Sequence, residues 1–479
     1  MTAYDVVVVG SGPNGLAAAL AFSELGLHTL VVEARDTPGG GMRTSALTAP
    51  GYLHDVCSTV HPLGLASPWL RALALEDHGL EWIHPTAPVA HVVGPGEVVT
   101  LERSIADTAA QLGPDGDAYR ALVEPFVEKF DELLRAILGP LRIPRHPLVM
   151  AQFGLRALRS MRGLGRTFRT RAAPALLAGI AAHSMVPLDG LATSSFGLVL
   201  ATAGHAVGWP IARGGSQAIC DAMVARFRAQ GGELVTRTYV ERLEQLPRAR
   251  AYVLDVTPKQ LLAIAGERLS AGYRRGLEQF RYGLGVFKMD WALSGPVPWR
   301  DPRCARSATV HLSGTLDDIA AAEDAAHAGK IAERPFLLFV QPTLFDPSRA
   351  PAGGHVAWAY CHVPNGSTID VTRAIEDHLE LHAPGFRDLV IARRAMNSAQ
   401  MESYNPNYVG GDINGGISDL AQLFFRPMPR FDPYATPLPD VFVCSSSTPP
   451  GGGVHGMCGY YAARSVLARV FGKQPPDLA

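Results

Sequence analysis

The first thirty residues contain a β-branched run, a glycine turn and an alanine-rich stretch. Residues 6–9 are four consecutive valines, a pattern typical of a buried parallel strand. The turn GSGPNG occupies residues 10–15, and the apolar residues 16–21 predict a helix. A second strand is expected over 28–32. The order of strand, glycine turn, helix and strand predicts a Rossmann-type α/β unit.

Each position of the glycine turn has its own role in such a unit. Gly10 permits the tight turn, Gly12 lets the backbone approach a pyrophosphate, and Gly15 lets helix and strand pack closely. Pro13 and Asn14 complete the turn at the helix N-terminus. Free N–H groups and the helix dipole favour phosphate there. We therefore expect this turn to bind a dinucleotide.

The residues after the second strand indicate which dinucleotide is bound. Glu33 lies 18 residues after Gly15, where a carboxylate accepts hydrogen bonds from a ribose and repels a 2′-phosphate. The alternative is that Glu33 is a solvated strand end. A second glycine turn follows at 39–44, and its cation can offset diphosphate charge. Because NAD-binding proteins rarely need a second turn, FAD is favoured. The further candidate cofactor residues are Ala34, Arg35, Gly40, Gly41, Met42 and Arg43.

Similar patterns along the chain predict an α/β fold with two domains. A helix over about 217–230 and strands over 233–235, 239–243, 251–255 and 441–444 are expected to return the chain to the nucleotide domain. Strands over 282–293, 336–340 and 355–360 are expected to form a mixed sheet. The predicted Rossmann-type FAD-binding domain comprises 1–70, 209–270 and 436–479. A discontinuous α+β substrate domain, built on the mixed sheet, comprises 71–208 and 271–435.

Composition excludes several classes of protein. Hydrophobic residues make up 47% and charged residues 18%, so disorder and coiled coil are not expected. Lys and Arg number 43 and Asp and Glu 44, so no general attraction to nucleic acid is expected. The six cysteines have no metal or disulfide spacing, which indicates a reducing compartment. Residues 1–4 lead straight into a strand, so we expect no signal peptide and a cytoplasmic location.

Two segments raise the question of membrane contact. Residues 133–188 contain no acidic residue and nine arginines, spread over 135–171. They predict a basic amphipathic surface helix that contacts anionic lipid, with a solvated basic face or a subunit contact as alternatives. Residues 190–212 carry no charge, but their polar content favours a buried helix beside the substrate cavity over a membrane span.

Three motifs together resemble a known family. The first is ExRDxxGG at 33–40, the second WPxxxGG at 209–215, and the third PGGGVxGxxG at 450–459. They resemble the phytoene-dehydrogenase-related FAD-dependent oxidoreductases, which include carotenoid desaturases and the pyridine nucleotide-disulphide oxidoreductase domain proteins. Desaturases usually place arginine directly after the glycine pair, whereas Gly41 and Met42 intervene here, which favours the second group. The resemblance implies that Val240 lies against adenine and that Gly453, Val454 and His455 approach the flavin.

The resemblance implies an oxidoreductase that removes hydride from a hydrophobic small molecule through FAD. Oxygen, a quinone or a protein would accept the electrons, because no second dinucleotide motif is present. A redox-neutral isomerase, a reductive saturase and a non-catalytic FAD-stabilised interaction protein are the alternatives. An amine oxidase is disfavoured, because prolines at 449–450 stand where such enzymes usually carry paired aromatic residues.

The candidate catalytic residues come from clusters near the glycine turns. They are His54, His61, Asp412 and His455. The alternatives are that His54 and His61 bond loop carbonyls, that Asp412 caps a turn, and that only the backbone of His455 is used. For Lys288, the sequence supports two interpretations equally: a buried cation near the substrate, or a residue at the edge of the sheet whose charge reaches solvent.

Overall fold

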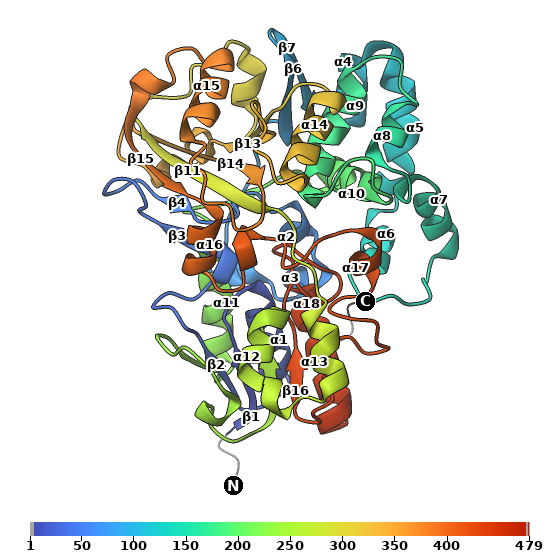
Figure 1. The fold of residues 1–479 in the computed structure, drawn as a ribbon, viewed down its shortest axis with the longest axis vertical. Coiled ribbons are helices and arrows are strands. Elements are labelled where there is room, and N and C mark those ends of the chain that lie inside the picture. Colours follow the sequence, from blue (N-terminus) through green and yellow to red (C-terminus); the bar gives the residue numbers. More distant parts are fainter. Residues whose placement is uncertain (1–3, 476–477, 479) are drawn as a thin grey trace.

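A computed structural model describes residues 4–475 and 478, and five parallel strands form one end of it (Figure 1). Their order is β16 (Val441–Val443), β10 (Ala249–Leu254), β1 (Tyr4–Val9), β2 (Thr29–Val32) and β9 (Glu233–Val235). Every neighbouring pair is parallel. This arrangement confirms the predicted Rossmann-type fold.

Helices cover both faces of the parallel sheet because the β1 side chains alternate between two cores. Val6 and Val8 pack with α1 (Pro13–Ser23), α11 (Gln217–Ala229) and α18 (Met457–Val466). Val7 and Val9 pack with α12 (Pro258–Ala265) and α13 (Ala271–Glu278) on the opposite face. The all-valine run is therefore buried on both sides, as expected of a central parallel strand.

One predicted strand of this domain is wrong. Residues 239–243 leave the sheet and end in a 3₁₀ turn, η5 (Leu243–Gln245). The cause is a reversal at Arg237, whose φ is +57° and whose N–H bonds the carbonyl of Arg35 at 2.8 Å. Thr238 N–H likewise bonds the carbonyl of Glu33. The segment thus folds back over the end of β2 instead of extending the sheet.

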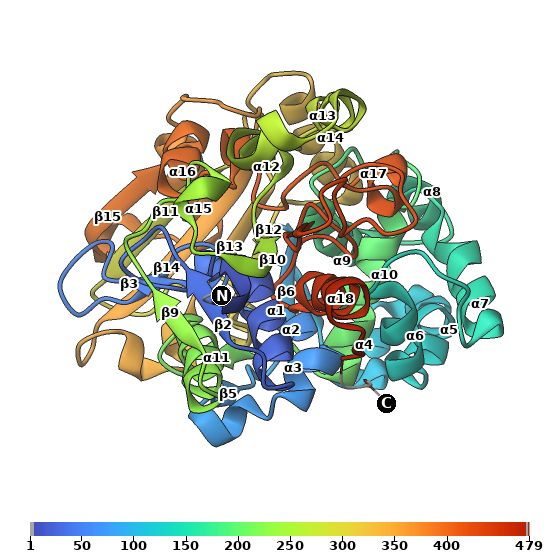
Figure 2. The same ribbon diagram turned by 90° about the horizontal axis from the view of Figure 1, so that it is seen from below.

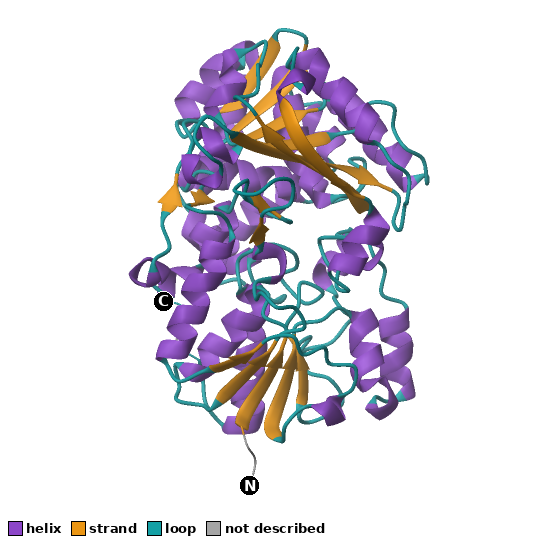
Figure 3. Cartoon of the chain, turned by 90° about the vertical axis from the view of Figure 1, so that its left-hand side faces the viewer, coloured by secondary structure: helices purple, strands orange, loops and turns teal. Residues whose placement is uncertain are grey.

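A seven-stranded mixed sheet forms the other end of the molecule (Figure 3). Its order is β15 (Val390–Met396), β11 (Gly285–Leu293), β14 (His355–Val363), β13 (Leu337–Val340), β12 (Thr309–Leu312), β6 (Val89–Gly94) and β7 (Glu97–Leu101). Only β12 and β6 pair in parallel. The predicted mixed sheet is confirmed, while the exact domain boundaries stay a prediction.

The two faces of the mixed sheet pack against different helices. On one face, α15 (Thr372–His382) covers Phe287, Met289 and Trp291 of β11. On the other, α9 (Ala172–Ala181), α10 (Thr193–Ala206) and α14 (Leu316–His327) pack on Trp358, Tyr360 and their neighbours. α10 is the buried helix predicted within 190–212.

The arginine-rich segment is not one helix, contrary to the prediction. It comprises the end of α6 (Phe130–Ile137), α7 (Pro147–Ala157), α8 (Met161–Gly165) and irregular stretches between them. Pro140, Pro144 and Pro147 interrupt it, because proline removes a helical N–H and restricts the residue before it. These helices lie together at one side of the molecule (Figure 2). Among residues 4–475 and 478, no helix is long and apolar enough to cross a membrane.

The remaining elements are short. The helices are α2 (Pro62–Ala66), α3 (Pro68–Ala72), α4 (Ile105–Gln111), α5 (Gly116–Val127), α16 (Ser398–Tyr404) and α17 (Leu420–Phe424). The strands are β3 (Thr44–Ser45), β4 (His54–Asp55), β5 (Trp82–Ile83) and β8 (Ile211–Ala212).

Candidate functional site

A cavity of about 1000 Å³ joins the ends of the parallel strands to the mixed sheet. Its wall brings together the three separated glycine turns, at 10–14, 40–41 and 452–453. Ligands of such α/β domains bind outside the carboxyl ends of the parallel strands, which is where this cavity begins. Val240, Val454 and His455 also line it, as do Glu33, Ala34, Arg35 and Arg43.

The first glycine turn packs so closely that side chains are excluded. A Cβ on Gly15 would lie 2.1 Å from the carbonyl oxygen of Gly10, and one on Gly40 would lie 2.8 Å from the Cα of Gly12. Gly15 therefore serves the packing of helix against strand, and it does not line the cavity. The first two glycine turns touch through their backbones. In the first turn of α1, Pro13 has no N–H, Gly15 donates to Asp255 and Leu16 donates to the Gly12 carbonyl, which leaves the N–H of Asn14 for a phosphate.

Glu33 is buried at the end of β2 and already holds the turn together. Its Oε2 accepts from Ser11 N–H at 3.0 Å, and its Oε1 accepts from Arg43 Nη2 at 2.9 Å. Arg43 also donates to the Thr37 carbonyl. Burial alone would lower the Arg43 pKa, but Tyr404 and Glu33 raise it above its usual value. Arg43 is thus ion-paired with Glu33. That Arg43 offsets the charge of a diphosphate stays a prediction.

Asp255 is a cavity residue that sequence reasoning did not select. It follows β10, and its carboxylate accepts from Gly15 N–H at 2.9 Å. Burial raises the Asp255 pKa to about 7, more than the Gly15 bond lowers it. The raised pKa favours the neutral carboxyl, which reduces repulsion of a phosphate. Its place directly after a core strand, like that of Glu33, was the available signal.

The third glycine turn leads into α18, which packs against α1. A Cβ on Gly459 would lie 1.9 Å from the carbonyl oxygen of Asn14. His455 lines the cavity, and its Nδ1 accepts from Met457 N–H at 3.1 Å. Burial lowers the His455 pKa to about 4, so this ring is neutral near pH 7.

The structure separates the other candidate residues. His61 lines the cavity, and its Nε2 lies 2.7 Å from Ser216 Oγ. Asp412 lies outside the cavity lining and accepts from the N–H groups of Gly283, Asn414 and Gly416, which is the turn-capping alternative. Met42 is fully buried in the core of the nucleotide domain, not in the cavity wall.

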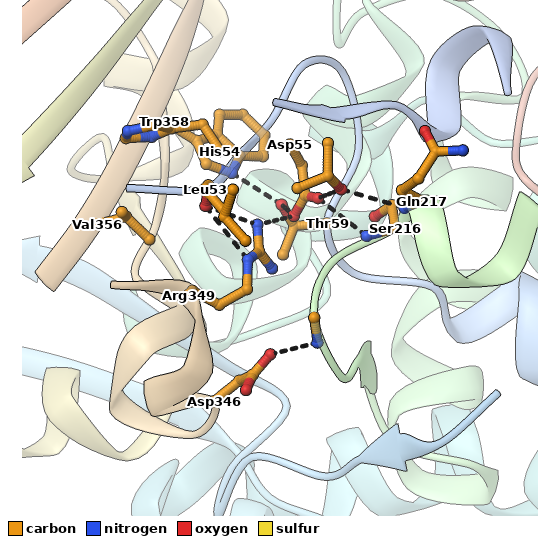
Figure 4. A network of polar contacts seen from close by, with 12 residues as sticks. Leu53, His54, Asp55, Thr59, Ser216, Gln217, Asp346, Arg349, Val356 and Trp358 are labelled. Carbon is orange, nitrogen blue, oxygen red and sulfur yellow. Dashed lines mark hydrogen bonds and ion pairs between the residues drawn. The ribbon is translucent and has the colours of Figure 1, made fainter. Parts of the chain in front are cut away.

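His54 belongs to a buried polar network between the two ends of the molecule (Figure 4). Its Nε2 lies 2.8 Å from Thr48 Oγ1, and it does not line the cavity. Beside it, Arg349 Nη2 lies 2.9 Å from Asp55 Oδ2, with both side chains wholly buried. Asp55 also accepts from the Ser216 N–H. This geometry gives His54 a structural place instead of the predicted catalytic one.

Trp358 and Tyr360 form an aromatic part of the cavity wall that sequence reasoning did not select, and they project from the same face of β14. Tyr408 also lines the cavity, while Tyr404, the last residue of α16, lies against Arg35 and Arg43 at the nucleotide end. The alternation at 358 and 360 was the available signal, because residues two apart on a strand share a face. Lys288 is buried, forms an ion pair with Asp290, and lies 5.0 Å from the Trp358 ring, so it is a buried cation and not an edge residue.

The residues present fit FAD. Helix α1 offers its positive N-terminal end to a pyrophosphate, Glu33 offers a carboxylate for a ribose, and the cavity continues past the third glycine turn to an apolar wall. The Asn14 amide oxygen is buried at this turn without a partner. Within the described part of the chain, no group of His, Cys, Asp and Glu is placed to hold a metal ion.

Comparisons with known proteins agree with this geometry. Residues 8–76 match the NAD(P)-binding Rossmann-like domain. Pyridine nucleotide-disulfide oxidoreductase domain-containing protein 2 of Rattus norvegicus is 26% identical, over 97% of this chain and 93% of its own length. The lycopene-forming phytoene desaturase of a Paracoccus species is 23% identical, over 95% of each.

Solved structures share the fold. An oxidoreductase from Methanosarcina mazei has a TM-score of 0.65 at 15% identity, over 97% of this chain and all of its own. A putrescine oxidase has a TM-score of 0.62 at 18% identity, over 97% and 99%. The full-length homology and the Rossmann-type domain together make this chain an oxidoreductase related to the phytoene desaturases and to pyridine nucleotide-disulfide oxidoreductase domain-containing protein 2.

Proposed function

We propose that this protein is an FAD-dependent oxidoreductase that removes hydride from a hydrophobic small molecule. The observation that carries the proposal is one continuous cavity, with a dinucleotide cradle at one end and an aromatic and aliphatic wall at the other. When bound, FAD supplies the hydride acceptor. The protein binds and orients both molecules, and its apolar wall excludes water from them.

The character of the wall supports an apolar substrate. Leu338, Phe153, Val199 and Leu200 line the cavity together with Trp358 and Tyr360. The wall histidines His61 and His455 are neutral near pH 7, because burial lowers each pKa to about 4. A neutral apolar chamber favours an uncharged substrate over a cationic amine.

Anaerobic mixing tests the direction of the chemistry. We expect FAD-loaded protein to lose its visible flavin absorption with an unsaturated hydrocarbon from a panel containing phytoene and limonene, and not with putrescine. A hydride leaving the substrate bleaches the cofactor in one turnover, whereas a redox-neutral isomerase leaves it oxidised while product forms. Bleaching by putrescine alone, or turnover of a hydrocarbon without bleaching, contradicts the proposal.

We also propose that the cavity mouth docks on an anionic lipid bilayer. Leu141, Leu158 and Phe424 are exposed and also line the cavity. In the arginine-rich segment, Ile143, Leu148 and Leu155 are exposed by 93, 84 and 79%. Leu191, Phe425 and Phe431 are exposed apolar residues in other segments. Arg142, Arg145 and Arg159 are exposed in the arginine-rich segment and complement anionic headgroups. A substrate dissolved in the bilayer would then enter the cavity directly.

Vesicle binding checks this docking surface. The double variant Leu148→Asp/Leu155→Asp is expected to bind phosphatidylcholine–phosphatidylglycerol vesicles at least about 100-fold more weakly, because burying each leucine contributes about 1.5–3 kcal/mol. Co-sedimentation measures the bound fraction. The matched control is Ile369→Asp/Ile391→Asp, at residues exposed by 54 and 55% in other segments. Equal binding of both variants, or a stable dimer of wild-type protein that buries this surface, contradicts the proposal.

A further inference from the structure

A short segment of the substrate domain crosses the dinucleotide cradle. It comprises residues 402–407, at the end of α16, and we call it the strap. Met401 and Tyr408, directly before and after it, are buried in the substrate-domain core. Residues 404–407 line the cavity, whereas every residue of the strap is half-buried or exposed to solvent. The strap therefore separates the cavity from solvent, and the proposed function gives it no role.

The first half of the strap is bonded to the loop that follows β2. Arg35 donates from Nη2 to the carbonyl oxygen of Ser403 at 2.8 Å and also to that of Tyr404. The Tyr404 ring lies against two guanidinium groups, with its centroid 5.5 Å from Arg35 Cζ and 5.8 Å from Arg43 Cζ. Arg43 is in turn held by Glu33. This half of the strap is thus attached to the residues that end β2.

The second half of the strap is bonded to the loop that follows β10. Asn407 Oδ1 accepts from Thr257 N–H at 3.0 Å, and Asn407 Nδ2 donates to the carbonyl oxygen of Asp255 at 3.2 Å. Gln260 of α12 donates from Nε2 to the carbonyl oxygen of Pro406. These bonds join the substrate domain to the nucleotide domain on the other side of the cradle.

The strand order determines what the strap crosses. In the parallel sheet, β1 lies between β10 and β2. A segment bonded to the loops after both outer strands must pass over the carboxyl end of β1, where the glycine turn at 10–15 begins. That end of a parallel sheet is where a dinucleotide binds. The cavity is lined by the glycine turn and by the strap, so a bound dinucleotide lies between them.

The contacts of the strap with the nucleotide domain can be exchanged for contacts with water. They are hydrogen bonds and an ion pair made by exposed or half-buried residues, such as Arg35 and Asn407. Opening such contacts costs little, because water replaces each partner. Segments held mainly by partly exposed hydrogen bonds are those that open locally while the core stays folded. The strap has this character between its two buried neighbours, Met401 and Tyr408.

We propose that the strap closes over bound FAD and opens to let FAD enter or leave the cradle. The inference rests on the proposed function, in which FAD occupies this cradle. The structure shows the strap in its closed position, so opening precedes binding as well as release. Weaker strap contacts therefore speed both association and dissociation. A residue that only contacts the cofactor would instead change mainly the dissociation rate.

The variant Asn407→Ala tests the strap through the rates of FAD exchange, without any substrate. It removes both hydrogen bonds of Asn407 to the loop after β10. We expect FAD association and FAD release each to become at least about fivefold faster, and the dissociation constant to change less than either rate. Release is measured by chasing bound radiolabelled FAD with excess unlabelled FAD. Association is measured from the change in flavin fluorescence after mixing FAD with cofactor-free protein.

A second variant acts on the strap from outside the cavity. Lys259 Nζ lies 2.6 Å from Glu402 Oε1, and neither residue lines the cavity. Lys259→Glu places like charges together and is expected to speed both rates at least about twofold. The matched control is Asn397→Ala, which removes the N-terminal cap of α16 within the substrate domain, where Asn397 Oδ1 accepts from Gln400 N–H at 2.9 Å. This control is expected to lower the melting temperature and to leave both rates unchanged.

The pattern of the two rates decides between an opening strap and a fixed wall. Faster release with unchanged association in Asn407→Ala would show a cofactor contact only and would overturn the proposal. A lower melting temperature with both rates unchanged in Asn407→Ala and in Lys259→Glu would show a structural role and would also overturn it. Failure of the hydride chemistry appears in the bleaching experiment and does not alter these rates.

Discussion

Replacing Gly15 with alanine is expected to yield protein that retains no FAD. The added Cβ would lie 2.1 Å from the Gly10 carbonyl oxygen and 3.1 Å from Asp255 Oδ2. Gly10 and Asp255 both border the cavity, so α1 must move away from β1 and its N-terminus loses its alignment with the cofactor. Overpacking of this kind destabilises a fold by about 1–3 kcal/mol. The FAD content of the purified protein and its melting temperature measure the two effects.

The control for this change is Gly272→Ala. Gly272 lies in α13 with no atom within 4 Å of a Cβ, so alanine is expected to stabilise that helix slightly, by about 0.5–1 kcal/mol. A Gly15→Ala protein that keeps stoichiometric FAD and wild-type melting would show that the turn does not hold the cofactor as described.

Replacing Arg349 with methionine is expected to destabilise the protein by about 3–5 kcal/mol. The change removes Arg349 from a pair whose side chains are both wholly buried, and it leaves a buried carboxylate without its counter-charge. Arg349 also donates to the Leu53 carbonyl, so it holds the segment before β4 against the substrate domain (Figure 4). Urea unfolding measures the loss, with Arg303→Met as the control, because Arg303 is 40% exposed and such pairs contribute about 1 kcal/mol or less.

The pH dependence of this loss gives a second check. Burial alone would raise the Asp55 pKa, but Arg349 and the bonds from Thr44, Thr59 and Ser216 lower it. A carboxyl group whose pKa is lowered by folding stabilises the folded state at pH values above its unfolded pKa, about 3.9. This stabilisation is lost as the pH falls below that pKa. The difference between wild type and Arg349→Met is therefore expected to be full at pH 7 and to shrink as the pH falls below about 4. A difference that grows on acidification contradicts this account.

The parts of the fold that depend on local sequence were predictable. The valine run, the glycine turn and α1 are contiguous, and each position has a backbone requirement that only certain residues meet. The strands β11, β13 and β14 were also predicted, because β-branched and aromatic residues favour a half-buried sheet surface. The prediction failed at 239–243, where the reversal at Arg237 depends on hydrogen bonds to the loop after β2.

The parts of the site that depend on tertiary packing were not predictable. His91 comes from β6, His311 from β12 and His183 from the 3₁₀ turn η4 (Ala182–Ser184) after α9, and no local pattern indicates that they meet. The sequence suggested Asp412 as a catalytic residue, but its carboxylate accepts hydrogen bonds from three backbone N–H groups. The helix expected in the arginine-rich segment is divided by prolines, whose effect outweighed the amphipathic pattern.

Titration of the cofactor-free protein with FAD tests the central claim most directly. The account predicts one FAD bound per chain, a yellow complex with perturbed flavin absorption, and a raised melting temperature, since a ligand that binds only the folded state stabilises it. NADP should not compete, because Glu33 would face its 2′-phosphate. A protein that stays colourless and shows no change in melting with excess FAD, or that binds NADP in its place, would contradict the account.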